Sequence, residues 1–336
     1  MGTLEPLPAR MRAWTWSRAE RAISLAEQAV PALGPQDVLV KNRASGLNPV
    51  DWKCIETDLG DLWPDGQIPG VDGAGVVVAV GDASNSHRLG EAVCYHQSLH
   101  RGGSFAEYTA VDARALIRLP QKMGWAEAAA FPCPVMTAWQ AIEKVPPQPG
   151  AHILITGAAG AVGRSLVQLA RARGFKVTAL AASKRHSALR ALGAELCIES
   201  IEQLTQACYA VFDTLSAEHA EQLASRVEAN GHLVCIMGRL ERAVVPGFST
   251  AVSQHEVALN ALHGTGSVAQ WQRFTQAGET LIKQLCEDEL KGPDIHLARF
   301  DQLAAALREC QGKRRALKYV VGAANACPAY NASELN

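Results

Sequence analysis

A glycine-rich turn between a buried strand and an amphipathic helix constrains this chain more than any other feature. The stretch Ile153–Gly163 has the sequence ILITGAAGAVG, and the helical pattern that follows it ends at Gly174. Gly160 and Gly163 match the second and third glycines of the pattern G-x-G-x-x-G, while Ala158 stands at the first. Small residues let the backbone approach a pyrophosphate, and the N–H groups at the helix start attract its charge.

Strands and helices alternate after this turn. Two helical patterns, at 186–192 and around 218–228, separate short apolar runs. These runs lie at 176–181, 196–198, 211–213 and 232–236. The alternation predicts βαβ units and a parallel sheet. Because a strand precedes the turn and a helix follows it, we favour dinucleotide binding over an ordinary tight turn.

The residues after the second strand of this region bear on the choice of dinucleotide. An acid about 20 residues beyond the turn would bind the ribose 2′-hydroxyl of NAD. This chain instead has Ser183, Lys184 and Arg185 there, and a hydroxyl with two cations suits a 2′-phosphate. We therefore expect NADP(H), although Ser183 capping a solvated helix fits the same residues. The other predicted contacts are Gly157, Ala159, Gly160, Ala161, Val162, Gly163, Met237 and Gly238.

The residues before and after this alternating region have different sequence patterns. Up to about Pro146, short apolar runs such as Val38–Val40 and Ala74–Val80 are cut by glycine, proline and polar clusters, which predicts a β-rich domain. The prolines at 146, 147 and 149 predict a connector to the second domain. From Lys291 the pattern predicts a helix, a basic turn and a final strand, followed by a frayed tail.

Composition excludes several classes of function. The 336 residues suggest two domains, and 32 basic against 33 acidic residues leave a net charge of -1. We therefore expect no charge-driven binding to nucleic acid or to a membrane surface. The nine cysteines are scattered without a C-x-x-C pair, which is typical of free thiols in a reducing compartment. With no apolar signal segment recognised, we expect a cytoplasmic protein.

Taken together, the motifs resemble the medium-chain dehydrogenase/reductase superfamily, in its zinc-independent quinone oxidoreductase branch. The matching stretches follow the family's order: Ala44–Lys53, Ile68–Gly81, Gly102–Val111, Ala128–Ile142, the glycine-rich turn and Phe300–Val321. The resemblance implies an α/β fold with a GroES-like, β-rich catalytic domain at 1–140 and 291–336. It also implies a Rossmann domain, a doubly wound parallel sheet, at 141–290, a reaction cleft between the domains, and a homodimer.

The resemblance also bears on single residues. It places Thr137 at a helix start that faces the cofactor, and it aligns Arg185 with a basic residue that relatives use for the 2′-phosphate. Relatives often have a tyrosine after the third strand, where this chain has Glu199 and Ser200. That departure counts against NADP(H).

A comparison with zinc-dependent relatives predicts that no metal is bound. They have a cysteine where this chain has Asn48, and a His-Glu pair where it has Val71 and Asp72. Their lobe of four closely spaced cysteines is also missing. Zinc needs clustered sulfur and nitrogen ligands. The scattered histidines, His87, His96 and His100, are expected to be exposed or hydrogen-bonded.

The expected reaction is hydride transfer from NADPH to a small molecule, either a quinone or an activated C=C or C=O bond, without a metal. In the resembled family Asn48 and Asp51 lie at the nicotinamide end of the cleft. Asn48 can then hydrogen-bond substrate or cofactor, and Asp51 can orient its neighbours. The alternative is that the segment LNPVD only forms a turn.

Other possibilities stay open at this point. The same cleft suits enoyl-thioester reduction, and a non-catalytic, crystallin-like NADPH-binding protein is a further alternative. Trp52 or Trp63 can form an aromatic wall for a flat substrate, or can simply pack in the core. The candidate proton donors are Tyr95, His96, Lys53 and water.

Overall fold

The computed structural model describes residues 2–4, 6–61, 63–312 and 317–322. Contacts between residues divide the chain into two compact units. The first unit contains Met1–Cys133 and Asn260–Asn336, and the second contains Pro134–Leu259. The predicted basic turn at 313–316 and the predicted frayed tail after 322 lie outside the described residues.

The first unit is built around a mixed sheet with the strand order β15-β16-β4-β5-β6-β8, in which β1 also pairs with β5 and β7 with β4. Its strands are β1 (Gly2–Thr3), β4 (Asp37–Gly46), β5 (Asp72–Val80), β6 (Ala92–His96), β7 (Tyr108–Asp112), β8 (Leu116–Arg118), β15 (Asp294–Arg299) and β16 (Leu317–Gly322). A separate two-stranded sheet joins β2 (Arg10–Ser17) to β3 (Ala22–Ala29). The helices are α1 (Pro49–Glu56), α2 (Trp125–Ala130), α7 (Ala261–Thr265), α8 (Val268–Cys286) and α9 (Leu303–Gly312).

Glycines let the central strands of this sheet pack closely. A Cβ at Gly75 of β5 would lie 2.1 Å from the carbonyl oxygen of Lys41 on β4. A Cβ at Gly73 would lie 2.3 Å from the hydroxyl of Tyr95 on β6. The glycines of this segment therefore mark close approach between strands, which positions Asp72 at the start of β5.

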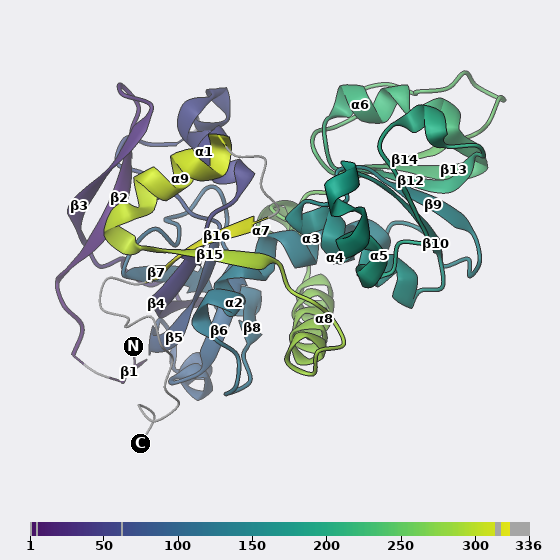
Figure 1. Ribbon diagram of the computed structural model, residues 1–336. Coiled ribbons are helices and arrows are strands. Elements are labelled where there is room, and N and C mark those ends of the chain that lie inside the picture. The colour runs from purple at the N-terminus through teal and green to yellow at the C-terminus, as the bar shows by residue number, and fades with distance from the viewer. Residues whose placement is uncertain (1, 5, 62, 313–316, 323–336) are drawn as a thin grey trace. The chain divides into compact units, whose positions relative to one another are not determined.

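The second unit is a parallel sheet with the strand order β11-β10-β9-β12-β13-β14. Its strands are β9 (His152–Ile155), β10 (Lys176–Leu180), β11 (Leu196–Ile198), β12 (Cys208–Asp213), β13 (Val227–Cys235) and β14 (Ser253–Glu256). Its helices are α4 (Ala161–Ala172), α5 (His186–Leu192) and α6 (Ala217–Gln222), and α3 (Pro132–Ile142) leads into it. Helix α4 packs against β9 and β10, α5 against β11, and α6 against β12 and β13 (Figure 1). The α/β class and the doubly wound parallel sheet expected from the sequence are confirmed.

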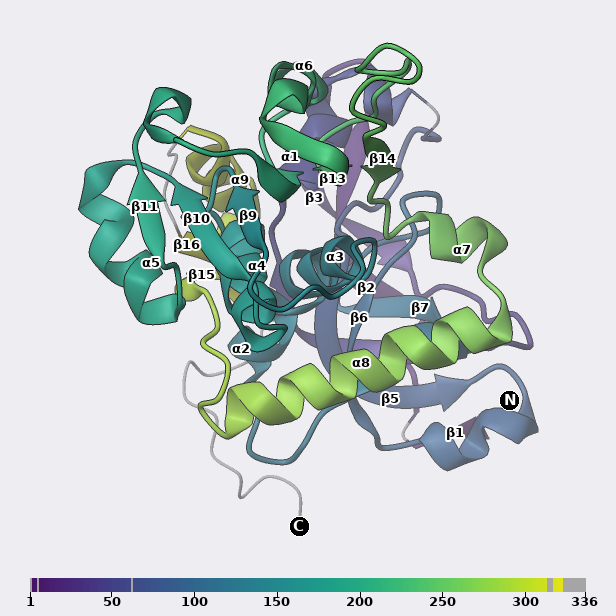
Figure 2. The same cartoon turned by 90° about the vertical axis from the view of Figure 1, so that its right-hand side faces the viewer.

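One expectation differs from the structure. The helix expected around 218–228 is wrong in length, because α6 ends at Gln222 and β13 already begins at Val227. Contacts group residues 260–290 with the first unit, and the domain division expected from the sequence stays a proposal. The reason for this grouping is α8, which packs against β8 and is the long helix in Figure 2. Gly278 of α8 faces Ile117, and Glu279 accepts a hydrogen bond from Arg118 at 2.8 Å.

None of the described helices is both long enough and apolar enough to cross a membrane.

Candidate functional site

The carboxyl ends of the parallel strands of the second unit bring the predicted dinucleotide contacts to one edge of its sheet. The chain runs outward from β9 to β11 on one side and from β12 to β14 on the other. The order therefore reverses between β9 and β12, and ligands of open α/β sheets bind beside such a switch point. The glycine-rich turn follows β9, and Met237 and Gly238 follow β13. Gly238 has a φ of 108°.

The glycine-rich turn has space for small residues only. Gly157 has a φ of 55°, and a Cβ there would lie 2.2 Å from Thr214 Oγ1. A Cβ at Gly163 would lie 2.5 Å from the carbonyl oxygen of Gly157. Ala158, at the position of the first motif glycine, is fully buried in the core, where a methyl group is accommodated.

The start of α4 fits the pyrophosphate of a dinucleotide. The residue before the helix is Gly160, which provides no side-chain cap, and the first turn contains no acidic residue. The N–H groups of Ala161, Val162 and Gly163 therefore point out of the helix start without a side-chain acceptor. Such N–H groups and the helix dipole attract an anionic group.

A buried carboxylate braces this edge of the sheet. Asp213, at the end of β12, accepts a hydrogen bond from Thr156 Oγ1 at 2.7 Å and another from His219 Nδ1. It also accepts the backbone N–H groups of Leu215 and Ser216, at 2.9 and 3.0 Å. The loops after β9 and β12 are thus held together. Sequence reasoning missed this residue, although an aspartate that ends a buried strand is a usable signal.

The turn after β10 contains the residues predicted to select the cofactor. Ser183–Arg185 form a 3-10 turn, with Lys184 exposed and Arg185 half-buried. The residue before α5 is Arg185, so Ser183 does not cap that helix. The backbone N–H of Ser183 donates to Glu199 Oε1 at 2.8 Å, and this bond lowers the pKa of Glu199. A carboxylate from the loop after β11 therefore contacts the residue that precedes the two cations.

The first unit contains a buried polar cluster around Asn48 and Asp51. Both side chains are almost fully buried, at 3% and 1% exposure. Asn48 Nδ2 donates to Asp72 Oδ2 at 2.9 Å, and more weakly to the carbonyl oxygen of Gly46 at 3.4 Å. Lys318 Nζ, from β16, donates to Asn48 Oδ1 and to Asp72 Oδ2, the latter at 3.0 Å. Asn48 is thus held by contacts with several segments.

Asp51 orients the backbone around Asn48. Its Oδ2 accepts the N–H of Asn48 at 2.7 Å, and its Oδ1 accepts the N–H of Val71 at 3.1 Å. Burial, with a smaller contribution from the nearby Asp72, raises the pKa of Asp51 to about 7 against the opposing effect of these N–H groups. The LNPVD segment is more than a local turn, because Asp51 joins the start of α1 to the residue before β5.

A second group of potential ligands surrounds Asp72. Its Oδ1 accepts the backbone N–H of Cys133 at 2.9 Å. Asp72, His96 and Cys133 each offer a metal-ligand atom, and these atoms lie within 4.8 Å of one another. His96 is 6% exposed, and its Nδ1 lacks a hydrogen-bond partner among the described residues. Burial lowers the pKa of His96 to about 4, so the ring is neutral at neutral pH.

His96 differs from the expectation of an exposed ring, because it is buried and its Nδ1 has no hydrogen-bond partner among the described residues. His87 and His100 are exposed, as expected. Local sequence gave no signal for the cluster, since His96 ends β6 while Cys133 lies in the first turn of α3.

The cluster in this arrangement does not fit a divalent metal. Asp72 Oδ2 already accepts hydrogen bonds from the Lys318 ammonium and the Asn48 amide, and its Oδ1 is used by Cys133. A metal ion would have to take the carboxylate away from an ammonium whose side chain is only 4% exposed. The positive charge that the buried Asp72 requires is present already.

The other candidate residues of the first unit are placed as follows. Trp63 is 4% exposed and packs edge-on against Trp16 at 5.7 Å, so it belongs to the core. Trp52 is half-buried, with Lys53 Nζ 5.9 Å from its ring centre. Tyr95 is fully buried, and its hydroxyl donates to Asn42 Oδ1 at 2.7 Å. Burial raises the pKa of Tyr95, which makes it an unsuitable proton donor.

Thr137, the remaining predicted cofactor contact, is half-buried in α3.

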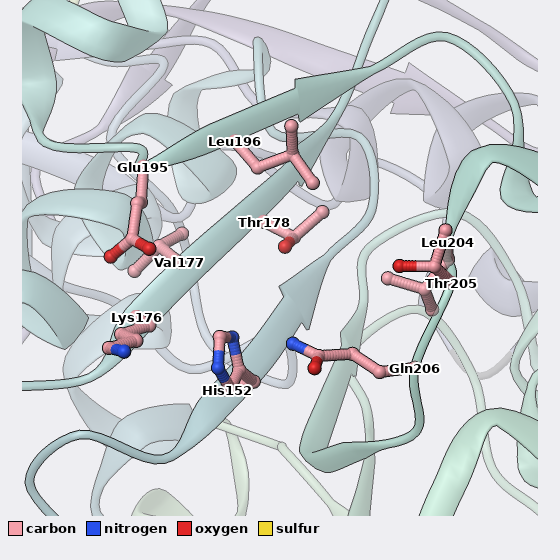
Figure 3. A pocket seen from close by; sticks show the side chains of 9 residues that line it. All are labelled: His152, Lys176, Val177, Thr178, Glu195, Leu196, Leu204, Thr205 and Gln206. Atoms are coloured by element: carbon pink, nitrogen blue, oxygen red, sulfur yellow. The ribbon is translucent and has the colours of Figure 1, made fainter.

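A separate pocket of the second unit lies at the opposite edge of its sheet, at the amino ends of β9 and β10. Figure 3 shows His152, Lys176, Thr178 and Gln206 lining it. This pocket is therefore not the dinucleotide edge.

Comparisons with known proteins agree with these features. Residues 34–121 match the model of the alcohol dehydrogenase GroES-like domain. A 2-methylene-furan-3-one reductase from Solanum lycopersicum is 33% identical over 277 residues, which are 76% of this chain and 69% of the relative. An NADPH-dependent alkenal/one oxidoreductase, chloroplastic, from Arabidopsis thaliana is 31% identical with the same coverage. A chloroplastic quinone-oxidoreductase homolog from Spinacia oleracea is 35% identical over 52% of this chain and 55% of its own.

A solved structure supports the same assignment. An alcohol dehydrogenase superfamily protein from Novosphingobium aromaticivorans is 27% identical, with a TM-score of 0.82 over 93% of this chain and 99% of that one. The GroES-like assignment made from the sequence is confirmed by the domain match. The chain therefore belongs to the medium-chain dehydrogenase/reductase superfamily as a quinone oxidoreductase-like member, an oxidoreductase that acts on a small molecule with a nicotinamide cofactor.

Proposed function

We propose that this protein is an NADPH-dependent reductase that transfers hydride to an activated C=C bond or a quinone without a metal. The observation that carries the proposal is the glycine-rich turn at the switch point of the parallel sheet, where α4 presents uncapped N–H groups. NADPH, when bound, supplies the hydride. The protein's residues position the ligands and exclude water.

We assign the pyrophosphate to the turn. Gly157, Ala159, Gly160, Ala161, Val162 and Gly163 would contact it. Asp213 keeps the turn in place through Thr156, since it holds the neighbouring loop at the same time. Thr137, Met237 and Gly238 are the proposed contacts for the rest of the cofactor.

The preference for NADPH rests on the turn after β10. Lys184 and Arg185 supply two positive charges for a 2′-phosphate, and Ser183 a hydroxyl. Glu199 opposes this preference, because its ionised carboxylate accepts the N–H of Ser183. Two cations against one carboxylate leave a positive balance. The name of the Arabidopsis relative, which specifies NADPH, supports the same choice.

The acceptor class rests on chemistry and on the names of relatives. The tomato and Arabidopsis proteins are named for the reduction of a methylene-furanone and of alkenals or alkenones. An enone is polarised by its own carbonyl, so it accepts hydride without a metal. Asp51 and Asn48 are the proposed positioning pair, and the two hydrogens of Asn48 Nδ2 are already directed at Asp72 and Gly46. The remaining atom of Asn48, Oδ1, already accepts a hydrogen bond from Lys318, so it could accept a further one only from a donor group of the cofactor.

Tyr95 and His96 are poor proton donors, since Tyr95 is buried with a raised pKa and His96 is neutral. We propose that the carbon that does not receive hydride is protonated by water. Trp52 stays a proposed aromatic contact. Three further points stay proposals: the homodimer, the cytoplasmic location, and the division into a catalytic domain (1–140 and 291–336) and a cofactor domain (141–290). For the location, two relatives are named as chloroplastic.

The test is NADPH oxidation measured against a panel of enones, quinones and an enoyl thioester, with NADH in parallel. We expect turnover with an enone or a quinone, and at least tenfold higher kcat/KM with NADPH than with NADH. Turnover of the thioester alone would support an enoyl-thioester reductase. Tight NADPH binding without turnover of any acceptor would support a non-catalytic binding protein.

A further inference from the structure

We propose that the Lys318 ammonium is the resident cation of the cluster formed by Asp72, His96 and Cys133, and that this cluster binds a divalent metal once the ammonium is removed. The inference rests on the proposed function in one respect, because it explains how the site works without a metal. Lys318 would then have two roles: it would exclude a metal ion, and it would orient Asn48.

The cluster has the ligand types of a zinc site. His96 contributes an imidazole nitrogen, Cys133 a sulfur and Asp72 a carboxylate oxygen, all within 4.8 Å of one another. Zinc bonds of about 2.0 to 2.3 Å place neighbouring tetrahedral ligands about 3.5 Å apart, so a contraction of about 1 Å would complete the site. Three protein ligands leave a fourth position open.

His96 has a buried nitrogen atom that is free to bind a metal ion. The Nδ1 atom of His96 is buried and has no hydrogen-bond partner among the described residues, in a side chain that is 6% exposed. A buried polar atom without a partner is costly, and a lone pair directed at a metal would satisfy it. The cluster around Asp72 therefore includes a histidine with an unused nitrogen.

Lys318 prevents this use. Its Nζ lies 3.0 Å from Asp72 Oδ2 and also donates to Asn48 Oδ1, and its side chain is 4% exposed. A divalent ion at the cluster would lie beside this ammonium, where burial leaves little solvent to screen the repulsion between two cations. It would also compete for an oxygen atom that already accepts two hydrogen bonds.

The charge of Lys318 can be removed while its unbranched stem is kept, in Lys318→Met. This leaves the buried Asp72 carboxylate without a cation, which a metal can replace. We expect the metal-stripped variant to bind one Co²⁺ per chain, with thiolate-to-cobalt charge-transfer absorption and a higher melting temperature when Co²⁺ is present. Wild type and Lys318→Arg, which keeps the charge, should show neither effect. Adding Cys133→Ser to Lys318→Met should remove the charge-transfer absorption.

Several results would overturn the inference. One is wild-type protein that binds one Co²⁺ with absorption that depends on Cys133. Another is a Lys318→Met variant with native near-ultraviolet circular dichroism that binds no Co²⁺. If Lys318→Met does not fold alone, it and Lys318→Gln are refolded with Co²⁺. Folded, cobalt-bound protein then supports the inference, and failure of both variants to fold with Co²⁺ contradicts it.

The outcome is separable from that of the proposed function. If wild type reduces an acceptor with NADPH while Lys318→Met binds no cobalt, only the role of Lys318 is wrong. If Lys318→Met binds cobalt while wild type reduces no acceptor, only the proposed function is wrong.

Discussion

The polar cluster of the first unit and the glycine-rich edge of the second differ in how each is built. The cluster is made of side chains from distant segments, since Asp72 and Lys318 are 246 residues apart, and both are nearly inaccessible to solvent. The glycine-rich edge is made mostly of backbone from one continuous stretch, and its N–H groups lack side-chain acceptors. One region satisfies its charges internally, and the other keeps hydrogen-bonding groups available.

This difference suggests a division of tasks. A region with an internally paired cation and anion keeps its structure without a ligand. Its stability then depends on each charged group, because removing one leaves the other buried and unpaired. A helix start with available N–H groups depends on few side chains and gains its partner when an anion binds. We therefore expect substitutions in the first region to change stability most, and substitutions in the second to change cofactor affinity.

The largest effect is expected for Asp72→Ala. It leaves the buried Lys318 ammonium and the Asn48 amide without their acceptor, which costs about 3 to 5 kcal/mol. The free energy of unfolding in urea measures the loss. The control is Glu27→Ala, which breaks an ion pair with Arg10 whose side chains are 61% and 70% exposed. That change should cost less than about 1 kcal/mol. Equal losses would contradict the contrast between the two kinds of pair.

The pH dependence of stability tests Asp51. Its pKa in the folded state is about 7, above an ordinary value of 3.8. The folded protein therefore binds more protons than the unfolded chain between these values, so the contribution of Asp51 to the free energy of unfolding falls as pH rises through this window. We expect a loss of about 2 kcal/mol between pH 5 and 7 relative to Asp51→Asn, measured in urea. Parallel pH profiles for the two proteins would refute the raised pKa.

Gly163→Ala tests the close packing of the cofactor edge. The added Cβ would lie 2.5 Å from the carbonyl oxygen of Gly157, so the turn must shift. We expect the dissociation constant for NADPH to rise about tenfold, equivalent to about 1.4 kcal/mol, in equilibrium fluorescence titrations. Gly247→Ala is the matched control, because a Cβ there meets nothing within 4 Å. Unchanged affinity in Gly163→Ala would count against the pyrophosphate site.

The smallest effects concern the choice between NADPH and NADH. Arg185→Ala should lower the NADPH-to-NADH ratio of kcat/KM about tenfold, whereas Glu199→Gln should raise it by about threefold or less. The exposed Arg190 of α5 provides the control, since Arg190→Ala removes an equal charge away from the turn. A ratio that changes equally in Arg185→Ala and Arg190→Ala would show that only overall charge matters.

The two regions also differ in how far the sequence predicts them. The spacing of Gly160 and Gly163 after an apolar run is a local pattern, and the strand, turn and helix it predicts are present at 152–155 and 161–172. Gly174, predicted as a helix end, has a positive φ of 80°, and Gly193, which follows α5, has a φ of 113°. The short-range spacing of the glycines was sufficient to predict this turn, because the turn is defined by backbone geometry.

The buried cluster could not be predicted in the same way. His96, Cys133 and Lys318 carry no shared local pattern, and only the pairing of β5 with β6 and the folding back of β16 bring them to Asp72. The carboxylate of Glu199 reaches Ser183 because β10 and β11 are neighbours in the sheet, a contact that spacing along the chain does not reveal. Asn48 and Asp51 were identified through family resemblance, and their burial emerged only from the fold.

The most direct test of the account is the kcat/KM for NADPH with an enone, measured on wild-type protein after metal has been stripped and its content determined. The account predicts that the value is unchanged when less than about one tenth of the chains carry a metal, and that added Zn²⁺ does not raise it. Activity that falls in proportion to the metal removed, and returns with Zn²⁺, would contradict it.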